Sequence, residues 1–210
     1  MDTYRRNQRK WDKLAPHFDR RRQTKSLRAV QRQAIDILEL RAGMTFLDLG
    51  CGTGWGLQYA HEQTAGKGSY IGLDLSEQMI AIANARFKDK PEVQLVCGAA
   101  EHFHHPPQSI DRIILTNTFH HLAAPKTVLR HINRLLKPEG RFCIADMTAD
   151  RWLAKIVNTI LQHTEKSHVS FYTSQQYESM FRETGLEIAA VHPLSPYFKL
   201  LVGRRTAIIK

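Results

Sequence analysis

The stretch TFLDLGCGTGWG, residues 45–56, decides the fold class. The apolar run 44–49 ends in alternating glycines, a pattern typical of a buried parallel strand that leads into a helix. Glycine lets the backbone turn tightly and approach a ligand where a Cβ atom would clash. The N-terminus of the following helix directs N–H groups and a positive dipole to the same place. The stretch therefore predicts a ligand-binding loop at the end of the first strand.

The spacing of these glycines disfavours one common ligand. The dinucleotide fingerprint GxGxxG needs its third glycine five residues after the first. Trp55 occupies that position, and it is too bulky for the close contact between helix and strand. The glycine falls one residue earlier, at Gly54. The loop therefore does not favour a pyrophosphate-binding NAD site.

An acidic residue follows the glycine loop at a distance that suits a nucleoside ligand. Asp74 ends the second strand-like run, about 20 residues beyond Gly54. A carboxylate there can accept hydrogen bonds from both hydroxyl groups of a ribose. Ser76, two residues later, can cap the next helix. The loop and Asp74 together predict an adenosine-containing ligand.

Strand-like and helical patterns alternate along the rest of the chain. Strand-like runs lie at 69–73, 93–96, 112–116, 141–145, 186–191 and 198–202, and helical patterns lie at 54–63, 76–87, 125–136 and 173–184. Upstream, the spacing predicts one helix over 4–22 and a second that starts at Ser26 and continues to Leu40. This order predicts an α/β fold with a Rossmann-like, doubly wound and mostly parallel sheet.

The positive charge is concentrated at the N-terminus. The 210 residues carry a formal net charge of +10, and residues 1–32 hold 11 Lys/Arg against 3 Asp/Glu, a net of +8. A basic segment can bind nucleic acid, an anionic membrane surface or an acidic substrate, or can be a solvated amphipathic helix. A hydrophobic content of 42% excludes a disordered or collagen-like protein.

Cysteine usage and the lack of targeting signals indicate a cytoplasmic protein. Cys51, Cys97 and Cys143 form no CxxC pair, so a reducing compartment is expected. The start MDTYRRNQRKW has no apolar region of the kind found in secretory signals. No apolar run approaches the roughly 18 residues that a membrane span requires.

Three segments in order resemble one family: LDLGCGTG (47–54), GLDLS (72–76) and LLKPEGRFCIAD (135–146). They are similar to the class I S-adenosylmethionine-dependent methyltransferases, close to the group that includes the ubiquinone and menaquinone methyltransferases. The resemblance covers residues 45–148 well and 11–18 and 171–204 more loosely. It implies a seven-stranded sheet of order 3-2-1-4-5-7-6 whose last strand is antiparallel, with N-terminal helices and a small helical cap.

The resemblance also implies S-adenosyl-L-methionine as the cofactor and assigns residues to it. Asp74 takes the ribose hydroxyls, and Leu75 and Met79 flank the adenine. The methionine portion lies against the loop made by Asp48, Gly50, Cys51, Gly52 and Gly54. Thr116 and Asn117, at the end of the fourth strand, complete the cofactor edge of the sheet.

The chain departs from the family pattern near the adenine. Relatives often carry an acidic residue where Ala99 stands, positioned to bind the adenine amino group. The backbone of Ala100 and the side chain of Glu101 are the candidates to replace it.

The residues after the fourth strand bear on the reaction. Methyl transfer from a sulfonium is an in-line displacement, so the protein mainly aligns donor and acceptor and removes water. The segment 111–122 lacks the motifs with which nucleic-acid base methyltransferases hold their substrates. His120 and His121 are the candidate catalytic bases, with packing or capping as the alternative. The cluster HFHH, residues 102–105, is weak support for a metal site, and no metal is predicted.

These features predict a single methyltransferase domain over 1–210. It comprises a basic helical arm or cap (1–40), a cofactor-binding core (41–148), a helical insertion (149–172) and a C-terminal helix with antiparallel strands (173–210). The insertion carries an apolar stripe that can dock on the core, form a lid or dimer contact, or lie on a membrane surface.

The predicted function is methyl transfer to an O, N or C atom of a small or medium organic acceptor. The basic arm favours an anionic acceptor. The alternatives are a methyltransferase that uses this arm to grip RNA or phospholipid, and a non-catalytic protein that binds the cofactor as a partner of others. Nucleic acid and membrane are not favoured as partners.

Overall fold

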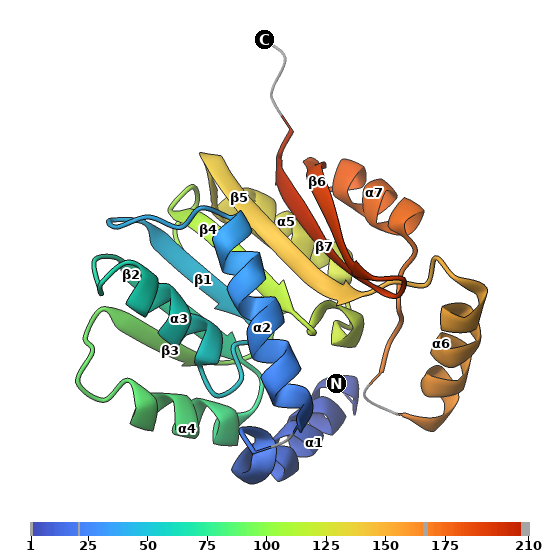
Figure 1. Cartoon of the computed structure of the whole chain (residues 1–210), viewed down its shortest axis with the longest axis horizontal. Coiled ribbons are helices and arrows are strands. Elements are labelled where there is room, and N and C mark those ends of the chain that lie inside the picture. Colours follow the sequence, from blue (N-terminus) through green and yellow to red (C-terminus); the bar gives the residue numbers. More distant parts are fainter. Residues whose placement is uncertain (1, 21, 166–167, 207–210) are drawn as a thin grey trace.

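The computed structural model describes residues 2–20, 22–165 and 168–206. Seven strands form one sheet in the order β3-β2-β1-β4-β5-β7-β6 (Figure 1). Their bounds are β1 Thr45–Leu49, β2 Ser69–Asp74, β3 Val93–Cys97, β4 Ile110–Thr116, β5 Leu136–Met147, β6 Leu186–Ser195 and β7 Phe198–Arg205. β7 runs antiparallel to both neighbours, β5 and β6, while β1 to β5 pair in parallel. The predicted strand order and the antiparallel last strand are confirmed.

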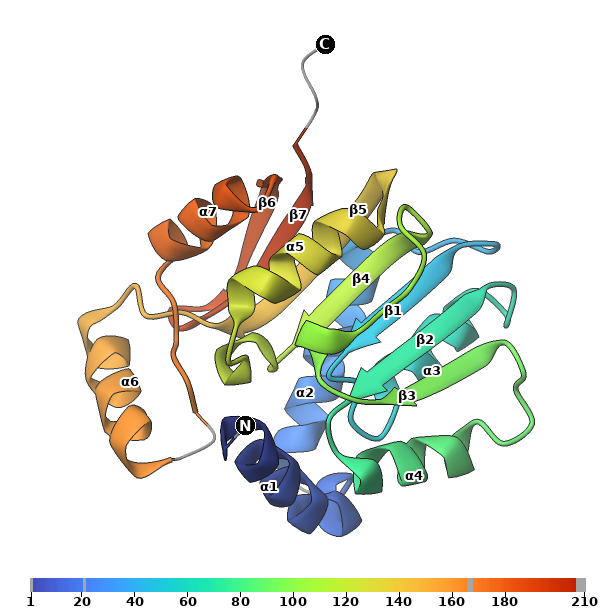
Figure 2. The same cartoon turned by 180° about the vertical axis from the view of Figure 1, so that it is seen from behind.

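Alternation of side chains along the strands builds one apolar core on each face of the sheet. Leu47 and Leu49 of β1 face a core that includes residues of α5 Pro125–Leu135 and α7 Ser174–Glu183. Phe46, the residue before Leu47, faces a second core shared with α2 Arg22–Ile37, α3 Trp55–Gln63 and α4 Glu77–Arg86. Figures 1 and 2 show these two helical layers from opposite sides. Both faces are covered, as a parallel sheet requires.

The N-terminal arm is two helices with a break earlier than the sequence indicates. α1 covers Asp2–Phe18 and α2 covers Arg22–Ile37, so the predicted helix over 4–22 ends four residues too late. Ser26 was predicted to cap the second helix, and this is wrong: it lies exposed inside α2. The break occurs at Asp19, whose carboxylate accepts hydrogen bonds from Thr53 and Trp55 and thereby stops α1 against the glycine loop.

The insertion forms α6, Trp152–Thr164, which stands at one side of the sheet (Figure 1). Two short 3-10 helices, η1 Ala100–His102 and η2 Phe119–His121, follow β3 and β4 at the carboxyl edge of the sheet. In the described part of the chain, no helix has the length and apolar character needed to cross a membrane.

Candidate functional site

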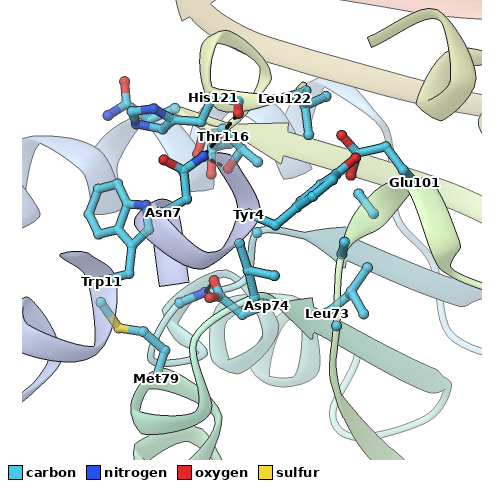
Figure 3. A pocket seen from close by; sticks show the side chains of 18 of the residues that line it. Tyr4, Asn7, Trp11, Leu73, Asp74, Met79, Glu101, Thr116, His121 and Leu122 are labelled. Atoms are coloured by element: carbon cyan, nitrogen blue, oxygen red, sulfur yellow. Dashed lines mark hydrogen bonds between the residues drawn. The ribbon is translucent and has the colours of Figure 1, made fainter. Parts of the chain in front are cut away.

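A cavity of about 220 Å³ lies at the carboxyl ends of β1, β2 and β4 (Figure 3). Its floor is the glycine loop and the segments that follow these strands, and its roof is α1. Of the twelve residues predicted to bind the cofactor, nine line it: Gly50, Gly52, Asp74, Leu75, Met79, Ala100, Glu101, Thr116 and Asn117. The topology brings them together because the carboxyl ends of parallel strands share one edge.

Positive φ angles shape the glycine loop. Gly50 (φ 82°), Gly52 (φ 53°) and Gly54 (φ 85°) lie in the left-handed region that favours glycine. A Cβ atom on Gly50 would come within 2.2 Å of Thr118 Oγ1, so no other residue fits there without a rearrangement. The amide N–H of Gly50 donates to the carbonyl oxygen of Leu73 at 2.7 Å. The loop is therefore tied to β2 and held at the edge of the cavity.

Asp74 has the environment expected of a ribose-binding carboxylate. Its Oδ2 accepts the N–H of Gly52 at 2.8 Å, and its Oδ1 accepts the N–H of Ser76 at 2.9 Å. Burial raises the pKa of Asp74, and these two amide hydrogen bonds act against that rise. A carboxylate has about four acceptor positions. The amides use two, so acceptor capacity is left for groups in the cavity.

Asp48 lies beneath the loop rather than in the cavity. It is fully buried, and neither carboxyl oxygen has a hydrogen-bond partner among the residues that the structure describes. Burial, followed by the charge of Asp74, raises the pKa of Asp48 to about 8. Cys51 and Gly54 also lie outside the lining of the cavity: Cys51 is buried, and Gly54 precedes α3. Asp48 thus lies below the loop and Cys51 and Gly54 are part of it, and none of the three lines the cavity.

Glu101 closes the far end of the cavity and has several partners. Its Oε1 accepts the N–H groups of Ala123 and Ala124, each at 3.2 Å, just before α5. The Tyr4 side chain points toward the same carboxylate (Figure 3), and burial followed by the Glu101 charge raises the pKa of Tyr4. Glu101 thus links α1 to the start of α5.

α1 forms the roof through one face of the helix. Tyr4, Asn7, Trp11 and Phe18 line the cavity, at intervals of three, four and seven residues, which mark a single helical face. Asp12, also on α1, accepts the Ser76 hydroxyl at 2.6 Å and so contacts the N-terminus of α4. The sequence predicts this helix but gives no signal that places Tyr4 and Asn7 at the cavity, because neither belongs to an apolar repeat.

The two candidate bases occupy different environments. His121 lines the cavity, its ring centroid lies 5.4 Å from that of Trp11, and its carbonyl oxygen accepts the Asn7 side-chain amide at 3.2 Å. His120 does not line the cavity. It is buried, and its Nδ1 lies 2.7 Å from Asp146 Oδ1. Burial alone would raise the pKa of Asp146, but His120 outweighs it and holds that pKa below its usual value.

The second histidine cluster makes local contacts. His104 Nδ1 lies 2.6 Å from the carbonyl oxygen of His102, and His105 Nδ1 lies 2.8 Å from Ser109 Oγ. Within the ranges that the structure describes, no three His, Cys, Asp or Glu side chains are grouped as metal ligands.

Sequence reasoning missed further lining residues. Leu73, Gly98, Thr118 and Leu122 flank predicted positions, and proximity to those positions is the only signal that marks them, whereas Ala99 is marked by its departure from the family pattern. Leu27 of α2 also lines the cavity. The described lining contains no lysine or arginine, so the expected anionic acceptor has no cationic partner there.

Comparison with known proteins assigns the chain to a family. A family model described as a methyltransferase domain matches residues 18–191. The chain belongs to this methyltransferase family. It has the Rossmann-like fold that the resemblance to S-adenosylmethionine-dependent methyltransferases implies.

Two curated relatives are named as methyltransferases of quinone-type compounds. The chain is 33% identical over 141 residues to the 2-phytyl-1,4-naphtoquinone methyltransferase of Thermosynechococcus vestitus, covering 66% of this chain and 63% of that protein. It is 30% identical over 140 residues to the demethylmenaquinone methyltransferase of Lactobacillus johnsonii, covering 64% and 57%. The match therefore spans less than two thirds of each relative's length.

A solved structure shares the fold. A putative methyltransferase in complex with the Haloferax volcanii Trm112 methyltransferase activator superposes with a TM-score of 0.79 at 20% identity, covering 94% of this chain and 98% of that one.

Proposed function

We propose that the methyltransferase binds S-adenosylmethionine in the cavity under α1 and transfers its methyl group to a small or medium organic acceptor held beside His121. One observation carries the proposal: a single cavity joins Asp74 and Gly52 to Asn117 and His121. The cofactor supplies an electrophilic methyl group on a sulfonium when it is bound. The residues of this chain bind the cofactor, orient the methyl donor and the acceptor, and exclude water.

The residues present suit such a cofactor. Asp74 has acceptor capacity left for ribose hydroxyls, and Leu75 and Met79 offer apolar surface for the adenine. A buried carboxyl without a partner, such as Asp48, is stabilised by a nearby cationic group, and the methionine portion has an ammonium. Thr116 and Asn117, at the end of β4, then lie where donor and acceptor meet.

The lining favours a largely uncharged acceptor. Trp11, Phe18 and Leu122 provide apolar and aromatic surface, and the names of the two quinone methyltransferases agree with an acceptor of this kind. The exposed cations of α1 lie outside the cavity, so a phosphate-bearing acceptor is not favoured.

His121 is the proposed base for an acceptor that must lose a proton. It is the histidine of the pair that lines the cavity. His120 is proposed as a positioning residue, since its ring lies 3.9 Å from that of His121 and is fixed by Asp146.

Calorimetric titration and an acceptor screen test the proposal. We expect binding of both S-adenosylmethionine and S-adenosylhomocysteine, and methyl transfer to a member of a panel of quinone-like, amine and lipid acceptors. His121→Gln is expected to lower turnover at least about 100-fold on an acceptor that loses a proton, because positioned bases contribute roughly that much. No binding of either cofactor form would refute the proposal.

A further inference from the structure

The outer face of α6 is an apolar surface that the fold leaves uncovered. Trp152 is 67% exposed, and the other large apolar residues of this face are 43–53% exposed: Leu153, Ile156, Val157 and Ile160. They occupy two adjacent rows, each with a spacing of four residues, so they form one continuous stripe. Globular proteins rarely expose such a stripe without a binding partner.

The opposite face of α6 fixes the helix to the domain. Ala154 is buried, and Asn158 Oδ1 accepts the N–H of Phe171 at 2.7 Å. Phe171 lies against the His120 ring, and the His120 carbonyl oxygen accepts the N–H of Val169 at 3.0 Å. A chain of contacts therefore runs from α6 to His120, whose neighbour His121 lines the cavity.

The charge around this stripe is positive. α6 contains no Asp or Glu, and Arg151 and Lys155 lie exposed at its start. Lys10 of α1 contacts Glu165, just beyond the end of α6, so the two helices are neighbours (Figure 2). The exposed face of α1 carries Arg5, Arg9 and Lys13 at intervals of four residues. We call these three residues the basic row.

We propose that α6 docks on an anionic membrane, with its apolar stripe in the headgroup region and the basic row of α1 against the lipid phosphates. An amphipathic helix with an apolar face, a tryptophan and flanking cations has the composition of interfacial helices. Anionic lipids attract basic segments placed beside such a helix. The inference rests on the proposed function in one respect: it names the acceptor as a lipophilic molecule that reaches the cavity from the bilayer.

The positive charge of this surface favours an anionic membrane over a second copy of the chain, and the apolar stripe favours it over RNA. A second copy of the chain would bring its own +10 charge against the same basic surface. RNA would neutralise the basic row but would leave the apolar stripe in water. An anionic bilayer can bury the apolar stripe and neutralise the basic row at the same time.

Vesicle flotation of the full chain tests the proposal. We expect the protein to float with vesicles of phosphatidylglycerol and phosphatidylcholine and to stay at the bottom with phosphatidylcholine alone. The variant W152S/I156S/I160S is expected to lower partitioning by about tenfold or more, because each change removes apolar burial. The control V191S/L194S changes two exposed apolar residues of β6 and is expected to float like the wild type.

A second pair of variants tests the charges. R5E/R9E is expected to reduce flotation severalfold and to reduce its dependence on salt, whereas K67E/K88E, two exposed lysines in loops at the opposite edge of the sheet, is expected to change neither. Equal flotation of the wild type and both test variants would overturn the proposal. So would a dimer in sedimentation that W152S/I156S/I160S converts to a monomer without any binding to vesicles.

Cofactor titration separates this proposal from the proposed function. Every variant above is expected to bind S-adenosylhomocysteine like the wild type. Normal titration without flotation would refute membrane docking alone. Absence of cofactor binding in the wild type would refute the proposed function, whatever the vesicles show.

Discussion

Asp74 is the single side chain on which cofactor binding is expected to depend most. Its two oxygens are oriented by the amides of Gly52 and Ser76. Asp74→Asn keeps the shape but loses the charge and one acceptor group. Hydrogen bonds to charged groups contribute about 1.5–3 kcal/mol. We therefore expect the affinity for S-adenosylhomocysteine to fall roughly 10- to 100-fold in calorimetric titration.

Asp111 provides the matched control for this substitution. It is also a carboxylate with backbone and side-chain partners, the Thr45 N–H at 2.8 Å and Lys137 Nζ at 2.7 Å, but it lies at the opposite edge of the sheet. Asp111→Asn should leave the affinity unchanged. An equal loss in both variants would mean that the effect comes from the fold and not from the site.

Asp48 makes stability depend on pH in a specific direction. Its pKa rises from 3.8 to about 8, so between these values the folded chain keeps a proton that the unfolded chain releases. Stability therefore falls as pH rises through this window, by about 1.36 kcal/mol per pH unit, and the loss is complete above pH 8. Asp48→Asn removes this contribution. Urea unfolding should show the wild type losing a few kcal/mol more than the variant between pH 5 and pH 8; parallel pH profiles would contradict the assignment.

At the scale of elements, one junction holds the roof in place. Asp19, between α1 and α2, accepts hydrogen bonds from Thr53 Oγ1 at 2.7 Å, within the glycine loop, and from Trp55 Nε1 at 2.9 Å, at the start of α3. Arg86 of α4 donates to the same carboxylate at 2.9 Å. Arg28 and Arg86 both lie over the Trp55 ring, with guanidinium carbons 3.4 Å and 4.0 Å from its centroid. The junction joins α1, α2, α4 and the start of α3.

Asp19→Ala is expected to loosen α1 over the cavity. The change leaves Arg86 without its ion pair and two donors without an acceptor, at a cost of about 1–2 kcal/mol after allowance for solvent screening. Cofactor dissociation should accelerate, measured by stopped-flow fluorescence of Trp11 in the cavity. Asp36→Ala, which removes an exposed acceptor of Tyr59 between α2 and α3, is the control and should leave the dissociation rate unchanged.

Elements differ in how far the sequence predicts them. The strands and the glycine loop follow from local signals, since apolar runs ending in glycine have few alternatives. The position of α1 over the cavity does not follow from local signals, because Tyr4 and Asn7 reach the cavity only through the tertiary docking of α1 on α4 and Glu101. The separation of His120 from His121 is likewise tertiary, because Asp146, which holds His120, is 26 residues away in the chain.

At the scale of the whole molecule, the two apolar cores suggest one cooperative unit. β7 lies between β5 and β6, and Phe142 of β5 packs on Phe181 of α7 with ring centroids 5.1 Å apart. The C-terminal segment cannot unfold without exposing these rings to water. This packing supports the single domain that the sequence predicts.

Scanning calorimetry tests whether the chain unfolds as one cooperative unit and whether the bound cofactor stabilises it. We expect one transition with equal calorimetric and van't Hoff enthalpies. A ligand at 100 times its dissociation constant stabilises the folded state by about 2.7 kcal/mol, which for a chain of this size raises the midpoint by about 5–10 °C. Asp74→Asn at the same S-adenosylhomocysteine concentration should show a smaller shift. Two resolved transitions, only one of which moves with ligand, would instead place the C-terminal strands in a separate unit, because the cavity is built from the carboxyl ends of β1, β2 and β4.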